Sequence, residues 1–192
     1  FFWNHVDSFI TVSNSINEWY FKNMGKKTSE VILNSPIIEK KSKQHIKMSI
    51  RDIFNIHLDT KIFIYAGQLS KGRGIDLILE IFASTQENIA LVFLGFGEKE
   101  AKIQSYSNKF PNIYLHRAVP HEEVVEICSS ADFGICLIEN VSLSDFLCLP
   151  NKLFEYTFSG IPVLASNFPE IRSTVKNLNL GMNYIKKHIF LG

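Results

Sequence analysis

The sequence predicts an α/β fold, a doubly wound parallel sheet, and three observations support it. Five short apolar runs of strand length occur at residues 61–67, 89–95, 112–116, 132–138 and 161–166. Nearly every residue in these runs is apolar, as expected for strands that are covered on both faces. Stretches of helical period separate the runs, and a regular alternation of strands and helices is typical of this class.

The helices are expected at about residues 75–85, 98–109, 121–130 and 151–159, each in a gap between two strands. The last is the most clearly marked, because Pro150 stands at its start and Gly160 just past its end. Proline and glycine are favoured at those two positions. Residues 139–148, between the fourth strand and this helix, are predicted to form a long polar loop.

The first part of the chain does not continue the same pattern. Residues 8–13 and 30–34 are predicted to be strands, and residues 14–23 a helix that stops at Gly25. A polar linker and a short helix follow, up to Asp59. We therefore predict two domains, residues 1–37 and residues 38–192, with a boundary near 37–45. Without further covering polypeptide, the aromatic residues of the first segment are expected to leave apolar surface exposed and to promote association. These are Phe1, Phe2, Trp3, Trp19 and Tyr20.

Composition excludes several classes of protein. The chain has 192 residues, of which 46% are hydrophobic and 20% charged, with a formal net charge of +1. It is therefore too apolar for intrinsic disorder and too balanced in charge for a dedicated nucleic-acid-binding domain. No apolar run approaches the ~20 residues that span a bilayer. The three cysteines, Cys128, Cys136 and Cys148, have no CxxC spacing and are predicted to be reduced and structural, in a cytoplasmic protein.

Basic residues gather between Lys22 and Arg51, where eight of them face only Glu30 and Glu39. A solvated linker explains this excess. The alternative is attraction to an anionic membrane surface or an anionic acceptor, because each basic group near such a surface contributes about 1 kcal/mol.

Candidate ligand-binding residues follow the predicted strands, because ligands of open α/β sheets bind beyond the carboxyl ends of the strands. After the first strand comes the segment Gly67-Gln68-Leu69-Ser70-Lys71-Gly72-Arg73-Gly74, whose glycines permit close backbone approach and whose cations suit a phosphate. After the second strand, Gly95 and Gly97 form a GxG pair. A dinucleotide-binding fingerprint would need a third glycine where Glu100 stands, and an acidic residue where His116-Arg117 stands.

The helix that begins after Pro150 is a second candidate. Its amino end would present the N–H groups of Asn151, Lys152 and Leu153 to an anion, with the Lys152 ammonium beside them. Glu155, one turn further on, could reach a pair of ribose hydroxyls or could be a surface glutamate. In the preceding loop, Ser142, Ser144 and Asp145 could line a ligand or belong to a mobile surface loop.

These motifs occur in an order that resembles the C-terminal, donor-binding half of GT-B glycosyltransferases of family 4, a Rossmann-like fold. The motifs are GxLxxx(K/R)G, LxGxG, ADxGI and PNKLFEYxxxGxPV, and the resemblance extends from about Asp7 to Gly181. Within it, residues 9–25 and 30–36 resemble the last segment of the N-terminal, acceptor-binding half.

The resemblance implies a role for each matching residue. Gly67 and Arg73 would lie on the donor pyrophosphate, Gly95 and Gly97 beside the nucleotide, and Val119 in the segment that meets the base. Gln68 replaces the usual arginine, which Lys71 or Lys152 would compensate. Glu155 matches the second glutamate of an E-x7-E pair, whose first position is Leu147. Asp145 or an amide near Asn151 would then contact the donor sugar.

The resemblance also implies a reaction. A sugar would move, with retention of configuration, from a UDP- or GDP-sugar to a saccharide or lipid-linked acceptor in cell-surface polysaccharide or glycolipid synthesis. No metal is expected, and the enzyme would be cytoplasmic, at the inner face of the membrane. Because such a site lies between two domains, we expect the 192-residue chain to bind nucleotide without catalysis. The alternatives are a nicotinamide-dependent enzyme and a non-catalytic nucleotide-sugar-binding module.

Overall fold

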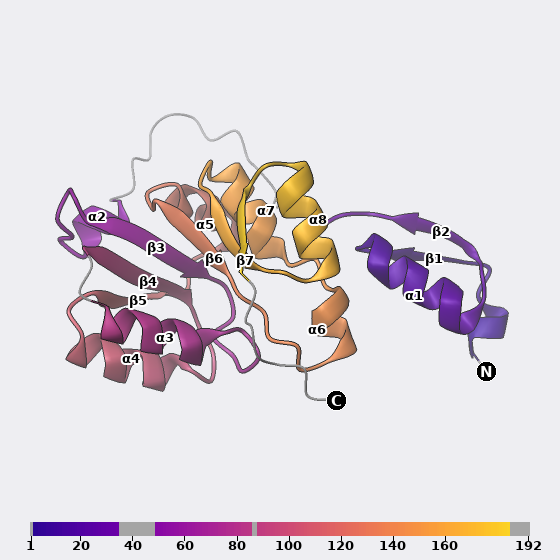
Figure 1. Cartoon of the computed structure of the whole chain (residues 1–192), viewed down its shortest axis with the longest axis horizontal. Coiled ribbons are helices and arrows are strands. Elements are labelled where there is room, and N and C mark those ends of the chain that lie inside the picture. Colours follow the sequence, from indigo (N-terminus) through magenta and orange to yellow (C-terminus); the bar gives the residue numbers. More distant parts are fainter. Residues whose placement is uncertain (1, 35–48, 86–87, 185–192) are drawn as a thin grey trace.

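A computed structural model describes residues 2–34, 49–85 and 88–184. Its centre is a six-stranded parallel sheet with the strand order β5-β4-β3-β6-β7-β8 (Figure 1). The strands are β3 (Lys61–Ala66), β4 (Ile89–Gly95), β5 (Ile113–Arg117), β6 (Phe133–Cys136), β7 (Val163–Ser166) and β8 (Gly181–Tyr184). The predicted doubly wound α/β sheet is confirmed, and β8 adds a sixth strand at its edge.

Helices cover both faces of this sheet (Figure 1). One face carries α3 (Ile75–Ser84) and α4 (Glu100–Lys109), and the other carries α2 (Ile50–Ile53), α5 (His121–Cys128), α7 (Asn151–Phe158) and α8 (Pro169–Asn177). Alternation along the strands builds the two cores: Ile62, Ile64 and Ala66 face α5 and α7, whereas Tyr65 faces α3. The burial of successive residues on opposite faces explains the continuous apolar runs.

The predicted loop at residues 139–148 contains a short helix, α6 (Leu143–Leu147). The Ser142 side chain caps this helix by accepting a hydrogen bond from the Asp145 amide at 3.1 Å. A serine followed three residues later by an acid is a helix-start signal that the polar composition of the segment obscured. The prediction of an irregular loop is therefore wrong for residues 143–147.

The strand order reverses between β3 and β6, and their carboxyl ends diverge there. Their pairing is limited to Phe63 with Phe133 and Ile64 with Gly134. Tyr156 of α7 occupies the gap: its hydroxyl accepts a hydrogen bond from the Ala66 amide at 2.9 Å and lies 3.1 Å from the Ile135 carbonyl. The Tyr156 ring lies so close to Gly134 that a Cβ on that glycine would be 2.4 Å from it. Tyr156 thus fixes α7 to both halves of the sheet.

The N-terminal residues form a separate unit, at the right of Figure 1. It comprises a 3-10 helix (Phe2–His5), the parallel pair β1 (Ser8–Thr11) and β2 (Thr28–Val31), and α1 (Asn14–Met24) between them. The helix confirms the prediction for residues 14–23. The second strand begins and ends earlier than the predicted 30–34, because its register pairs Thr28–Val31 with the four residues of β1. The predicted boundary near 37–45 lies outside the described residues. The two described units contact each other through hydrogen bonds.

Two hydrogen bonds at the start of α1 join the units. The Ser13 hydroxyl donates to the Leu147 carbonyl at 3.1 Å, at the end of α6. The Ser15 amide donates to the buried Glu170 carboxylate at 2.5 Å, in the first turn of α8. No described helix is long and apolar enough to cross a membrane.

We predict that Tyr156→Phe lowers the free energy of unfolding by about 1–3 kcal/mol, because the Ala66 amide and the Ile135 carbonyl lose a buried partner. Urea unfolding followed by circular dichroism measures this change. The matched control is Tyr106→Phe on α4, since the Tyr106 hydroxyl forms no hydrogen bond with the described residues. An equal effect of the two substitutions would contradict the role of Tyr156.

We predict concentration-dependent association through the N-terminal unit. Of the aromatic residues predicted to be exposed, Phe2 is exposed, whereas Trp3, Trp19 and Tyr20 are partly buried and Phe1 lies outside the described residues. Trp3 stacks on Tyr20 at 5.2 Å. The exposed apolar surface also includes Ile10, Ile32 and Leu33. Ile10 is 69% exposed on the sheet face opposite Phe9. Light scattering should show association that the double substitution Ile10→Thr, Ile32→Thr reduces. A monodisperse wild-type monomer at high concentration would contradict this prediction.

Candidate functional site at the carboxyl edge of the sheet

The segments that follow β3 and β4 touch each other at the carboxyl edge, and glycine makes this contact possible. A Cβ on Gly95 would lie 1.9 Å from the Gly67 carbonyl oxygen, and one on Gly97 would lie 2.5 Å from the Leu69 carbonyl oxygen. The Gly67 amide donates to the Leu94 carbonyl at 2.9 Å. Gly95 and Gly97 therefore have a packing role, while Gly67 and Gln68 are exposed at the edge.

Arg73 is held at this edge by the chain that follows β6. Its Nη1 lies 2.9 Å from Asp145 Oδ1, and the other oxygen of Asp145 accepts a hydrogen bond from Ser142 at 2.6 Å. In the same loop the Glu139 carboxylate accepts from the Gly74 amide at 3.0 Å, at the start of α3. The structure thus brings Arg73 and Asp145 together, as neighbours in an ion pair.

The Lys152 ammonium lies at the point where β3 and β6 diverge. It extends from α7, and its Nζ is 3.5 Å from the centroid of the Tyr65 ring, which belongs to the core on the opposite face. It is also 3.7 Å from the position that a Cβ of Gly67 would occupy. Lys152 forms no ion pair with the residues that the structure describes. Desolvation, with a smaller contribution from Arg73, lowers the pKa of Lys152 to about 8.

Glu155 lies one turn further along α7 and is 7% exposed. No described residue donates a hydrogen bond to its carboxylate; the closest cation is His121, the first residue of α5, whose Nδ1 is 3.6 Å from Glu155 Oε1. Burial raises the pKa of Glu155, and His121 and Lys152 oppose this rise. A buried carboxylate without donors is costly unless a ligand supplies them.

The amino end of α7 leaves two backbone donors unused. Among the described residues, nothing accepts from the amides of Asn151 and Lys152, whereas the Leu153 amide donates to the Pro150 carbonyl at 3.1 Å. The Leu153 side chain is fully buried in the core. Leu153 therefore has no free group for a ligand, and the anion-binding capacity predicted for this end rests on Asn151 and Lys152.

The remaining predicted residues lie around the same edge. Val119 is partly buried between β5 and α5. Lys71 has an exposed side chain, and its amide donates to Glu98 at 2.7 Å. Leu147 is partly buried, and its carbonyl accepts the hydrogen bond from Ser13. Sequence reasoning did not identify Tyr65, Glu139 or His121, for which neither spacing nor motif gave a signal.

Part of the basic stretch has a structural role. Arg51 donates to the carbonyls of His57 and Thr60 and lies 3.6 Å from Asp132, beside β3. Lys40, Lys41, Lys43 and Lys47 lie outside the described residues. The described cysteines are all free, and burial raises the pKa of Cys136 to about 12, as expected for structural thiols. No group of three potential metal ligands occurs among the described residues.

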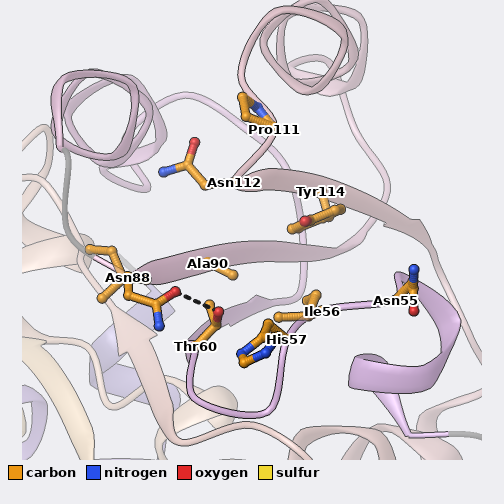
Figure 2. Close-up of a pocket in the computed structure, with 10 residues that line it drawn as sticks. Asn55, Ile56, His57, Thr60, Asn88, Ala90, Pro111, Asn112 and Tyr114 are labelled. Carbon is orange, nitrogen blue, oxygen red and sulfur yellow. Dashed lines mark hydrogen bonds between the residues drawn. The ribbon is translucent and has the colours of Figure 1, made fainter.

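A pocket of about 230 Å³ lies at the opposite edge of the sheet from the candidate site (Figure 2). Polar side chains line it, including Asn88, whose carbonyl oxygen accepts a hydrogen bond from Thr60 at 2.6 Å. Asn112 donates to the Phe82 carbonyl at 2.9 Å. These groups satisfy one another or the backbone, in contrast to Lys152 and Glu155.

The fold is that of GT-B glycosyltransferase structures. WaaG, a glycosyltransferase involved in lipopolysaccharide biosynthesis, is 18% identical, with 93% of this chain and 49% of that chain covered and a TM-score of 0.66. Anabaena HepE in complex with UDP-glucose is 13% identical, with 88% and 47% covered and a TM-score of 0.67. Sucrose-phosphate synthase from Thermosynechococcus elongatus is 18% identical, with 95% and 46% covered and a TM-score of 0.66.

Residues 47–187 match the family described as glycosyl transferases group 1, and the protein therefore belongs to this family. No curated protein sequence matches the chain. The chain spans about half the length of the solved structures above.

We predict that Lys152→Met stabilises the ligand-free protein at neutral pH by up to about 3 kcal/mol, because it removes a partly buried, desolvated ammonium that is ion-paired with no described carboxylate. In the unfolded chain a lysine binds its proton below about pH 10.4, whereas Lys152 in the folded chain does so only below about 8. The contribution of this group to stability therefore rises between these pH values.

Urea unfolding at pH 7 and at pH 9.5 tests this prediction. The advantage of Lys152→Met over wild type should be largest at pH 7 and smaller at pH 9.5. Lys176→Met on α8 serves as the control, because the Lys176 side chain is exposed and forms no ion pair with the described residues. If Lys152→Met were less stable than wild type at both pH values, the charge of Lys152 would not lower the stability of the folded protein, contrary to this prediction.

Proposed function

We propose that this chain is the donor-binding half of a glycosyltransferase of family 4 that uses a UDP- or GDP-sugar. The observation that carries the proposal is the pair of ionisable groups on α7 that the described residues leave unsatisfied. Lys152 is a cation without an anion, and Glu155 is a buried acceptor without donors. A nucleoside diphosphate would supply both partners, with its phosphates for Lys152 and its ribose hydroxyls for Glu155.

The position of these groups supports the same ligand. They lie beyond the carboxyl ends of β3 and β6, where the strand order reverses and where open α/β sheets bind nucleotides. The free amides of Asn151 and Lys152 would add hydrogen bonds to the phosphates, and Arg73 is 30% exposed at the same edge. The related HepE structure was determined with UDP-glucose.

The chemistry proposed for these residues is electrostatic. Departure of a nucleoside diphosphate from the sugar places negative charge on the β-phosphate, and cations and amides fixed in advance stabilise that charge. Gln68 stands in the place of the family's arginine and carries no charge, so Lys152 and Arg73 would provide the cations. Asp145 or the Asn151 amide would orient the donor sugar. The resemblance implies retention of configuration and catalysis without a metal.

We assign the acceptor side of the reaction by resemblance. A saccharide or lipid-linked acceptor in cell-surface polysaccharide or glycolipid synthesis, at the cytoplasmic face of the membrane, fits the family and the basic residues between Lys22 and Arg51. Residues 1–37 would be the end of the acceptor-side domain. The 192-residue chain by itself would then bind the donor without transferring the sugar. A non-catalytic nucleotide-sugar-binding module is the second candidate, which the leucine at position 147 favours.

We predict selective binding of one nucleoside diphosphate. Calorimetric titration with UDP, GDP, ADP and NAD(H) should give one ligand that binds, with affinity reduced about tenfold or more in Arg73→Ala, Lys152→Met and Glu155→Ala, since each loses a charged contact. Arg172→Ala and Glu80→Ala are the matched controls, because both side chains are exposed and neither is a candidate site residue.

Two outcomes would overturn the proposal: no binding of any nucleoside diphosphate, or binding of NAD(H) that these substitutions leave unchanged. Turnover distinguishes the two candidates. Transfer or hydrolysis of the matching nucleotide sugar by the full-length protein would exclude the non-catalytic module.

A further inference from the structure

We infer that His121 is a positioning residue of the nucleotide site, which keeps Glu155 ionised and so sustains ribose recognition as the pH falls. The inference rests on the proposed function and extends it to a residue that no motif of the sequence identified. It starts from one contact, the 3.6 Å between His121 Nδ1 and Glu155 Oε1.

The fold fixes this contact from both sides. His121 is the first residue of α5, directly after the loop that ends at Pro120. The Ser159 hydroxyl, at the end of α7, donates to the Val125 carbonyl of α5 at 2.9 Å, so the two helices are attached to each other. The position of the imidazole beside Glu155 therefore follows from helix packing.

At this distance a charge on His121 can stabilise the Glu155 carboxylate without using its hydrogen-bond acceptors. At 3.6 Å the imidazole is too far for a short hydrogen bond, and the oxygens of Glu155 stay available for two hydroxyl groups. The His121 side chain is 53% exposed and that of Glu155 is 9% exposed. The imidazole is therefore the more exposed member of the pair.

The other groups around this pair are few. Glu155 is faced by Lys152 of its own helix, by His121 of α5 and by the thiols of Cys128 and Cys136. On its own helix His121 is followed by Glu122 and Glu123. Cys128 is buried and its raised pKa keeps its thiol neutral, so it adds no charge beside Glu155.

The sign of the effect follows from these charges. Burial favours the protonated form of Glu155, and the cations His121 and Lys152 favour the carboxylate that accepts from ribose hydroxyls. When a neutral residue replaces His121, Lys152 alone opposes the rise that burial causes in the pKa of Glu155. Glu155 then takes up its proton at a higher pH, and nucleotide binding weakens earlier as the pH falls.

The experiment compares wild type with His121→Gln and His121→Arg by calorimetric titration of the nucleoside diphosphate that the wild-type chain binds, at pH 5.5 and 7.5. Both values lie below the pKa of Lys152, about 8, and any change in its charge between them is common to wild type and the variants. The phosphate of the ligand also titrates in this range, but it contributes equally to every variant and cancels in the comparison. His57→Gln, at the opposite edge of the sheet (Figure 2), is the matched control.

The ratio of the Kd of His121→Gln to that of wild type should be about threefold to fivefold larger at pH 5.5 than at pH 7.5. An effect of this size is typical of a partly exposed charge pair. His121→Arg, with a permanent charge, should retain wild-type affinity at pH 5.5. The 2′-deoxy form of the ligand should show a smaller difference between wild type and His121→Gln, because it offers Glu155 one hydroxyl fewer.

A pH profile of His121→Gln that coincides with wild type would overturn the role of His121 and leave the proposed function standing. An equal loss in His121→Gln and His121→Arg at both pH values would indicate a structural role alone, and would also overturn it. Absence of binding by the wild-type chain at either pH would overturn the proposed function and this inference together.

Discussion

The arrangement of the site depends on how α7 is attached to the sheet where the strand order reverses. β3 and β6 share two residue pairs before they diverge, and beyond that point no ladder joins the two halves of the sheet. The Tyr156 hydroxyl takes the place of the missing ladder, between the Ala66 amide and the Ile135 carbonyl. Gly134 provides the space for its ring. Together with the buried side chains of Leu153 and Phe154, this contact places the groups that α7 presents, from Asn151 to Glu155.

The same attachment explains why two ionisable groups can remain unsatisfied. Lys152 extends from α7 through the divergence and rests on the Tyr65 ring, and Glu155 is buried against α5. Both arrangements cost folding free energy, since each group loses hydration without gaining a full partner. The rigid core around Tyr156 offsets that cost. The charged groups of α7 therefore lower the stability of the free protein while they would favour ligand binding. Such a trade-off is common at binding sites with preorganised charges.

Sequence reasoning predicted the sheet well because its signals are local. Strand runs such as 61–67 are apolar on both faces, and Pro150 and Gly160 mark the ends of α7. It missed α6, in which a polar composition outweighed the cap at Ser142, and it shifted the second N-terminal strand, whose limits depend on pairing with β1. The contact of Tyr156 with Ala66 joins residues 90 positions apart. Likewise, His121 reaches Glu155 only through the packing of α5 on α7, and Leu153 loses its free amide only through the detailed geometry of the first helical turn.

The contact between the two units places the short helix α6 between them. Ser13 holds the last carbonyl of α6, and Asp145, two residues earlier on the same helix, holds Arg73. This short helix therefore makes contacts in two directions, to the N-terminal unit through Leu147 and to the guanidinium at the carboxyl edge of the sheet through Asp145. A displacement of Ser13 that kept its hydrogen bond would reposition Asp145, so the setting of Arg73 is coupled to the neighbouring unit.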